Sequence, residues 1–267
     1  MLYAPLTRTI WPLWLVFAGL VLVGAFALLL LDRLQRSGER LQNQLAEQER
    51  LNGALEDFSW RVAHDLRGPL AGIFAGIELM NKPDLPETTR HELSASIARQ
   101  ARKGTDLVSD LLDLATASGT AKRQSVSTKD LFEEIAQDVQ DVVLEVSDVP
   151  EYISVDPVSF RQAALNLARN AGKYGSTDGS KPLLDVSAES DGSEVTFTFA
   201  DRGPGLADGQ GKDIFEPFKR GANTTQPGSG LGLAIVGAMT EAHGGRAWYE
   251  DRLGGGASFK VLIKLED

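Results

Sequence analysis

Apolar residues recur at helical spacing over two long stretches in the first half of the chain. In residues 58–80 they step by three and four positions and form one stripe, and in residues 93–115 they recur near heptad spacing. Residues 81–86, between the two stretches, contain two prolines that break a helix. One such hairpin leaves much of its apolar surface uncovered. The pattern therefore predicts a helical hairpin at 58–118 that pairs with a second copy as a four-helix bundle, which makes the protein a homodimer.

The second half of the chain alternates between helical and strand-like segments. Helical periodicity spans residues 128–139, 157–173 and 230–243. Strand-like runs span residues 142–146, 184–188, 195–200 and 258–265. A mixed sheet covered on one face by helices is the simplest two-layer arrangement of these elements. The predicted fold class is therefore α+β and multidomain, with a C-terminal α/β two-layer sandwich at 122–267.

Two segments between these elements lack apolar periodicity. Residues 117–121 are small and suit a hinge between the hairpin and the sandwich. Residues 206–227 include glycines and a proline. We expect most of them to form a mobile lid, because unstructured loops of this length are usually functional or disordered.

The N-terminal region contains an uncharged apolar run from Ile10 to Leu31. As a helix its 22 residues would span roughly 33 Å, about one hydrocarbon thickness. One arginine precedes the run and three follow it closely, so the positive-inside bias places the rest of the chain in the cytoplasm. We expect residues 1–31 to be a tail and one transmembrane helix, without a separate external sensing domain. A signal peptide cleaved after Ala25-Phe26-Ala27 is the alternative, although such apolar regions are usually only ~7–15 residues long.

Residues 32–57 are polar, with leucines recurring near heptad spacing. This segment is expected to be a helical, coiled-coil-like linker. A single solvated helix is the alternative, and Gly38 and Gly53 weaken either helix.

Composition narrows the possible functions. A formal net charge of −10 gives no electrostatic support for nucleic-acid binding, so no such partner is expected. The chain contains no cysteine, which excludes disulfides, thiolate catalysis and cysteine-ligated metals. Its three histidines are His64, His91 and His243, too few to favour a multi-histidine metal site.

Four motifs follow one another along the chain. Ala63-His64-Asp65-Leu66-Arg67-Gly68-Pro69-Leu70 lies in the first helical stretch, and Asn166-Leu167-Ala168-Arg169-Asn170-Ala171-Gly172-Lys173-Tyr174 lies in a later one. Asp201-Arg202-Gly203-Pro204-Gly205 follows a strand, and Gly228-Ser229-Gly230-Leu231-Gly232-Leu233 opens a helix. From about Phe58 to the last residue, the set resembles the sensor histidine kinases of bacterial two-component systems. The resemblance implies a phosphoacceptor hairpin, an ATP-binding domain and the bacterial inner membrane as location.

His64 is the predicted phosphoacceptor. It is rotated about 200° around the helix from Val62, so it should point away from the apolar stripe into solvent. A neutral imidazole nitrogen can attack a γ-phosphoryl group. Asp65 could hold the proton of the other ring nitrogen, and the resemblance assigns it a base-like role. Pro69 should bend the helix here, and His91 is the alternative acceptor.

The later motifs suit a nucleotide. Asn166 and Asn170 share one helical face, and Lys173 follows three residues on. Amide oxygens suit Mg²⁺, and a lysine neutralises phosphate charge. A glycine turn that enters a helix provides N–H groups for an anion.

The resemblance assigns roles within this pocket. It implies that Asn170 ligates Mg²⁺, that Asn166 and Lys173 approach the phosphates of ATP, that Tyr174 packs against adenine and that Asp201 accepts a hydrogen bond from its amino group. The other expected pocket residues are Gly203, Gly205, Phe215, Phe218, Lys219, Arg220, Gly228, Gly230, Leu231 and Gly232. Phe215 and Phe218 would anchor the lid. Lys219 or Arg220 would reach phosphate, although either could be an ordinary solvated charge.

The expected function is that of a membrane-anchored protein-histidine kinase. It would phosphorylate His64 from ATP and pass the group to an aspartate of a separate cytoplasmic response regulator. Gly68 stands where the family often has a side chain associated with phosphatase action, which predicts weak phosphatase activity. The rival functions are an ATPase that works as a clamp and a non-catalytic dimeric scaffold.

Overall fold

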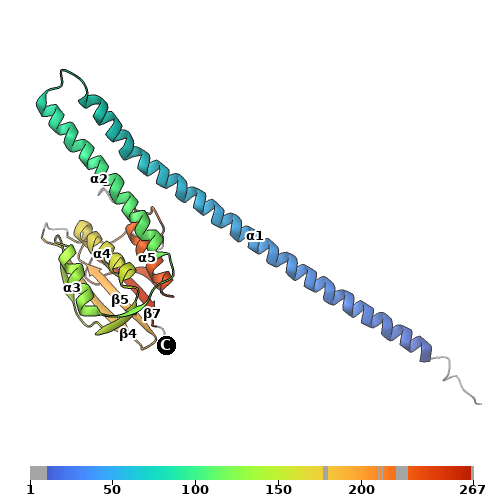
Figure 1. Cartoon of the computed structure of the whole chain (residues 1–267). Coiled ribbons are helices and arrows are strands. Elements are labelled where there is room, and N and C mark those ends of the chain that lie inside the picture. Colours follow the sequence, from blue (N-terminus) through green and yellow to red (C-terminus); the bar gives the residue numbers. More distant parts are fainter. Residues whose placement is uncertain are drawn as a thin grey trace, which may run out of the picture. The chain divides into compact units, whose positions relative to one another are not determined.

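The computed structural model describes residues 11–176, 180–207, 209, 211, 213–220 and 228–265 (Figure 1). In the first helix, the side chains of residues 11–14, 16 and 23–31 lie outside the described part. The chain divides into two compact units, Met1–Val62 and Ala63–Asp267, which are described in turn.

The first unit is helical in its described part. Helix α1 runs from Trp11 to Met80, so it continues beyond this unit and includes Pro69 without a break. Leucines along residues 34–55 are 51–68% exposed. No helix in the described part of the chain is long and apolar enough to cross a membrane. Of the run predicted to span the membrane, Ile10 and the side chains of residues 23–31 lie outside that part.

The second unit begins with the predicted helical hairpin, which is confirmed. The end of α1 is followed by a turn at 81–86 and by α2, Glu87–Ala117. Gly76 lets the two helices approach closely, because a Cβ there would lie 2.6 Å from Cγ1 of Ile97. Much of the hairpin's apolar surface nevertheless stays exposed, including Leu70 at 52% and Ile77 at 46% on the predicted stripe and Phe74 at 72% beside it.

The remainder of the second unit is an α/β sandwich, as predicted. Its five-stranded sheet has the order β2-β4-β5-β7-β6, and a separate antiparallel pair joins β1 to β3. Strand β2 is parallel to β4, and all other neighbours are antiparallel. The strands are β1 Gln124–Ser127, β2 Val143–Val146, β3 Tyr152–Val155, β4 Leu183–Ser190, β5 Glu194–Asp201, β6 Arg246–Asp251 and β7 Ala257–Lys264.

Three helices cover one face of this sheet: α3 Thr128–Asp138, α4 Pro157–Tyr174 and α5 Gly232–Ala242 (Figure 1). Helix α4 carries four of the predicted pocket residues, Asn166, Asn170, Lys173 and Tyr174. It begins where Asp156 accepts hydrogen bonds from the backbone N–H groups of Val158 and Ser159, with proline in the first turn. The cap satisfies donors that the helix itself leaves unpaired.

Alternating strand residues pack against the helices and form the core. Phe197 and Phe199 of β5 are 0% and 2% exposed and contact Phe132 of α3 and Phe160 of α4. His243, which ends α5, is also buried. Its Nε2 accepts a hydrogen bond from Asp156 N, and its Nδ1 donates to Met239 O. The core and this bonded histidine fix α4 and α5 relative to the sheet.

Candidate active site

His64 lies on α1 with its side chain 64% exposed, in agreement with the orientation expected from the helical pattern. Its Nδ1 lies 3.1 Å from Oδ1 of Asp65. An ionised carboxylate only accepts hydrogen bonds, so Nδ1 carries the proton of the neutral ring. This tautomer puts the nucleophilic lone pair on Nε2. The other candidate acceptor, His91, is an exposed residue of α2.

Helix α4 faces the glycine motif. Asn166 is only 6% exposed, and its Nδ2 has no hydrogen-bond partner within the described residues. A Cβ at Gly232 would lie 3.6 Å from Oδ1 of Asn166, and one at Gly228 would lie 3.9 Å from Nζ of Lys173. The structure therefore brings an amide and an ammonium group to the two ends of the motif. A buried, unpaired amide N–H is suited to a ligand oxygen.

The other two residues predicted on α4, Asn170 and Tyr174, are both half-buried. In the described part of the chain, no cluster of three or more histidine, cysteine or acidic side chains could hold a metal ion. The amide oxygen of Asn170 fits Mg²⁺ as one oxygen ligand, the remaining ligands coming from phosphates and water.

The glycine motif turns sharply into α5. Gly230 has φ +74°, and a Cβ there would lie 2.9 Å from Cα of Phe218. Phe218 N donates to Gly230 O over 2.9 Å, so the end of the predicted lid is attached to the motif. Leu231 is fully buried, and α5 begins without a side-chain cap. The first N–H groups of α5 therefore remain available for an anion.

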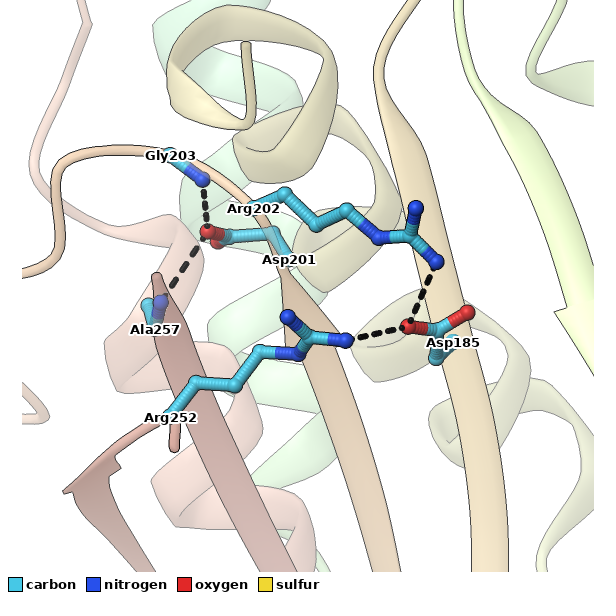
Figure 2. Close-up of polar contacts among 6 residues, drawn as sticks. All are labelled: Asp185, Asp201, Arg202, Gly203, Arg252 and Ala257. Atoms are coloured by element: carbon cyan, nitrogen blue, oxygen red, sulfur yellow. Dashed lines mark hydrogen bonds and ion pairs between the residues drawn. The ribbon is translucent and has the colours of Figure 1, made fainter. Parts of the chain in front are cut away.

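Asp201 is 4% exposed at the end of β5. Its Oδ1 accepts hydrogen bonds from Gly203 N at 2.9 Å and from Ala257 N at 3.1 Å (Figure 2). Because both bonds use one oxygen, the carboxylate is oriented while Oδ2 can accept from a ligand. Gly203 also allows close packing, since a Cβ there would collide with the carbonyl oxygen of Tyr174.

Sequence reasoning identified Gly203 and Gly205 but missed the opposite side of this turn. Gly205 has φ +71°, and its Cβ would lie 3.1 Å from Gly256 O. Gly256 has φ +113°, and a Cβ there would collide with Asp201 O. The run of three glycines at 254–256 was the available signal. It lets the start of β7 approach the carboxylate.

The described lid residues contact the sandwich. Phe215 packs edge-on against Phe259 with ring centroids 6.5 Å apart. Lys219 forms an ion pair with Glu216 at 3.4 Å, and Arg220 is exposed. Residues 208, 210, 212 and 221–227 of the predicted lid lie outside the described residues.

The end of α2 packs against the sandwich. Ala117, in the predicted hinge, is 2% exposed and belongs to the core. Asp110 accepts a hydrogen bond from Ser229 Oγ of the glycine motif, and Asp113 accepts one from Gln162 Nε2 at 2.6 Å. Burial and the neighbouring Asp110 raise the pKa of Asp113, which Arg169 partly offsets. In this conformation the phosphoacceptor hairpin therefore holds the glycine motif directly.

Comparisons with known proteins agree with this arrangement. Residues 54–120 match the His Kinase A (phospho-acceptor) domain, and residues 155–267 match the histidine kinase-, DNA gyrase B- and HSP90-like ATPase domain. The chain belongs to the two-component sensor histidine kinases, the family in which these two domains occur together.

Individual relatives cover most of the chain. It is 30% identical to the sensor protein KdpD of Escherichia coli over 91% of this chain and 28% of KdpD. It is 32% identical to the signal transduction histidine-protein kinase/phosphatase MprB of Mycolicibacterium paratuberculosis, over 87% of this chain and 47% of MprB. Full-length ShkA in complex with AMPPNP is similar, with a TM-score of 0.55 and 28% identity over 76% of this chain and 45% of ShkA. The chain thus spans less than half the length of these relatives.

Proposed function

We propose that the chain is an ATP-dependent protein-histidine kinase that phosphorylates His64 and then passes the group to an aspartate of a separate response regulator. The observation that carries the proposal is an exposed imidazole whose Nδ1 is paired with Asp65. The same chain has an α5 N-terminus without a side-chain cap, where Asn166 lies close to Gly232, and Lys173 lies close to Gly228 at the start of the glycine motif. A nucleophile and a phosphate site are thus both present.

The proposed reaction follows from these groups. Nε2 of His64 attacks the γ-phosphorus, a nitrogen–phosphorus bond forms, and the bond from that phosphorus to the oxygen of ADP breaks. Asp65 keeps the Nδ1 proton in place and stabilises the positive charge that develops on the ring. Lys173 and the N–H groups of α5 neutralise phosphate charge. Bound Mg²⁺, held in part by Asn170, would supply further neutralisation, and the rate would depend mainly on positioning.

Approach of the nucleotide to His64 requires the sandwich to move on residues 117–121. The hydrogen bonds of Asp110 to Ser229 and of Asp113 to Gln162 would have to break in that movement. Both acceptors are carboxylates on the hairpin, and both donors lie on the sandwich. The conformation seen here is therefore proposed to be a resting state.

A homodimer and a membrane anchor complete the proposal. The exposed apolar surface of the hairpin, which includes Leu70, Phe74 and Ile77, supports pairing of two hairpins as a four-helix bundle. The uncharged run Ile10–Leu31 and its flanking arginines support a single span in the bacterial inner membrane, with the kinase domains in the cytoplasm. Separation of membrane and soluble fractions tests the anchor, since recovery of the intact chain from the soluble fraction would reject it.

Weak phosphatase activity is the proposed consequence of Gly68. This position lies one helical turn after His64 and has no side chain to orient a water molecule. The relative MprB is named a kinase/phosphatase. The phosphatase activity of this chain is therefore measured directly and not inferred from its relative. The chain is incubated with its phosphorylated regulator, and rapid loss of phosphate would reject the proposal.

Labelling with γ-³²P ATP tests the kinase itself. The wild-type chain should acquire an acid-labile, alkali-stable label, as expected of phosphohistidine, and His64→Gln should acquire none. His91→Gln is the matched control and should be labelled normally. ATP turnover without labelled protein would favour the rival ATPase, and failure to bind ATP with Mg²⁺ would favour the scaffold.

A further inference from the structure

A second carboxylate, Asp185 on another strand of the sheet, forms ion pairs with two arginines of the segments next to Asp201. Asp185 of β4 places its Oδ2 3.1 Å from a terminal nitrogen of Arg252 and 3.6 Å from one of Arg202 (Figure 2). The Arg252 side chain is 28% exposed and that of Asp185 is 33% exposed. The Asp185–Arg252 pair therefore lies partly shielded from water, where it weakens less with salt than a fully exposed pair does, whereas the Arg202 side chain is 54% exposed.

The sheet register places Asp185 on the face opposite the nucleotide pocket. Leu184 pairs with Asp201, and Asp185 pairs with Ala200. Successive residues of a strand point to opposite faces. Leu184 is buried against the helices at 1% exposure, so Asp185 lies on the other face. Any effect of Asp185 on nucleotide binding must therefore pass through other residues.

Each arginine belongs to a segment that orients the Asp201 carboxylate. Arg202 lies between Asp201 and Gly203, whose N–H is the first donor to Oδ1. Arg252 begins the glycine turn and is bonded across it, with Arg252 N donating to Gly256 O at 3.1 Å and Gly255 N donating to Arg252 O at 3.0 Å.

The glycine turn delivers the second donor, Ala257 N, to the same Oδ1. Strands β4 and β6 are not neighbours, because β5 and β7 lie between them. Asp185 thus links β4 to the turn between β6 and β7, which no strand pairing joins to β4 directly.

We propose that Asp185, through Arg202 and Arg252, is a positioning residue for adenine recognition by Asp201. The inference rests on the proposed function and on the role that the family resemblance implies for Asp201, which is to accept a hydrogen bond from the adenine amino group. A hydrogen bond weakens steeply with misplacement of either partner. Loss of the Asp185 charge frees both turns, so Gly203 N and Ala257 N no longer fix the angle of the carboxylate.

The test uses Asp185→Asn in the full-length chain and two nucleotides. ATP carries the amino group, and purine riboside 5′-triphosphate lacks it. We expect the KM for ATP in His64 labelling to rise about three- to tenfold, with kcat changed by less than about twofold. The affinity for purine riboside triphosphate, measured by calorimetry, should change by less than about twofold. The melting temperature should fall by no more than about 2 °C, as for a partly exposed ion pair.

Two further variants sharpen the result. Asp185→Asn combined with Arg252→Gln should weaken ATP binding little more than Asp185→Asn alone, because the two residues act through one contact. Glu250→Gln is the matched control. Glu250 forms an ion pair with Lys260 in the same sheet but contacts neither turn, so both affinities should stay unchanged.

Equal losses for both nucleotides, or a fall in melting temperature with unchanged KM, would overturn the positioning role and leave a structural one. Equal wild-type affinity for the two nucleotides would also overturn it, because Asp201 would then not read the amino group. Absence of label on His64 would instead reject the kinase proposal, and the binding measurements would still decide the role of Asp185.

Discussion

The sandwich of this kinase family member buries its apolar side chains, whereas the hairpin leaves many of its apolar side chains exposed. In the sandwich, Phe160 and Phe197 are 1% and 0% exposed, whereas Phe74 on the hairpin is 72% exposed. Gly256 and Gly68 show the same difference, although Gly76 of the hairpin is also closely packed, against the side chain of Ile97. A Cβ at Gly256 would collide with Asp201 O, but one at Gly68, in the hairpin, meets no atom within 4 Å.

The difference separates two kinds of functional requirement. The nucleotide pocket needs backbone groups and a carboxylate held in fixed positions, which only a packed core with close backbone contacts provides. In the proposed function, His64 is reached by ATP and by a regulator, and an exposed helix provides that access. The apolar surface that the hairpin leaves exposed would then be covered by a second copy in the proposed dimer.

The largest effect is expected when the close packing of the sandwich is broken by Gly256→Ala. The added Cβ is forced into Asp201 O at a φ of +113° that alanine avoids. The free energy of unfolding of the sandwich should fall by roughly 3 kcal/mol or more, and ATP affinity by about tenfold or more. Calorimetry of unfolding and of ATP binding measures both effects.

Gly254→Ala is the control for this substitution. Gly254 has φ +93° but no atom within 4 Å of a Cβ, so only backbone strain is added. That strain should cost about 1–2 kcal/mol. Equal losses in the two variants would show that close approach to Asp201 contributes nothing.

A smaller effect, confined to assembly, is expected from Phe74→Ser on the hairpin. Burial of one phenylalanine stabilises by about 1.5–3 kcal/mol, and a symmetric dimer loses two. The dissociation constant of the dimer should rise by about 100-fold or more, with ATP affinity per protomer unchanged. Sedimentation equilibrium measures the first quantity, and Phe74→Leu should restore most of the assembly. An unchanged dimer would show that this part of the hairpin's apolar surface is not its interface.

The sequence predicted those parts of the fold that carry a local signal. The helix expected at 157–173 is α4, Pro157–Tyr174, because its apolar periodicity and its Asp156-Pro157 start are both local. Strands β1 and β3 have four residues each and pair with one another across 24 or more intervening residues. Four residues are too few to show the alternation of apolar and polar positions that identifies a strand. Their pairing depends on segments that come together only in the folded chain. Strand β6, at the sheet edge, was missed for the same lack of a clear alternation.

The pocket was predictable only in part for a related reason. Asp201 was identified from its motif, but its partner Ala257 N is 56 residues away and reaches it through the pairing of β5 with β7. Contacts between Asp110 and Ser229 and between Asp185 and Arg252 likewise depend on packing between distant segments. Sequence motifs identify the residues that contact a ligand. The residues that hold those side chains in place are brought near them only by the fold.

The cap of α4 offers a pH-dependent test of the sandwich. Burial raises the pKa of Asp156, but hydrogen bonds from Lys122, Ser159 and Val158 outweigh it and hold the pKa below its usual value. The folded state therefore favours the charged form. Its contribution is present above the unfolded pKa of about 4 and is lost as pH falls through the lower folded pKa.

Asp156→Ala should accordingly destabilise the sandwich by about 1 kcal/mol at pH 7, and the deficit should shrink below pH ~4. Asp156→Asn should keep most of the stability at pH 7, since asparagine also caps helices well, but lose the pH dependence. Urea unfolding between pH 3 and pH 7 measures both. A deficit that stays constant over this range would show that the charge of Asp156 contributes nothing.

The smallest effect is expected from Gly68→Ala, the hairpin counterpart of Gly256→Ala. The helix interior gains an alanine where no atom lies within 4 Å, so α1 should become more stable by up to about 1 kcal/mol. Circular dichroism on heating measures the gain, and the KM for ATP and the dimer dissociation constant should not change. Weaker dimerisation would instead mean that Gly68 allows a second copy to approach closely. Gly68 would then lie on the buried side of the bundle. That result would conflict with the solvent-facing orientation inferred for His64, which lies one helical turn earlier on the same face.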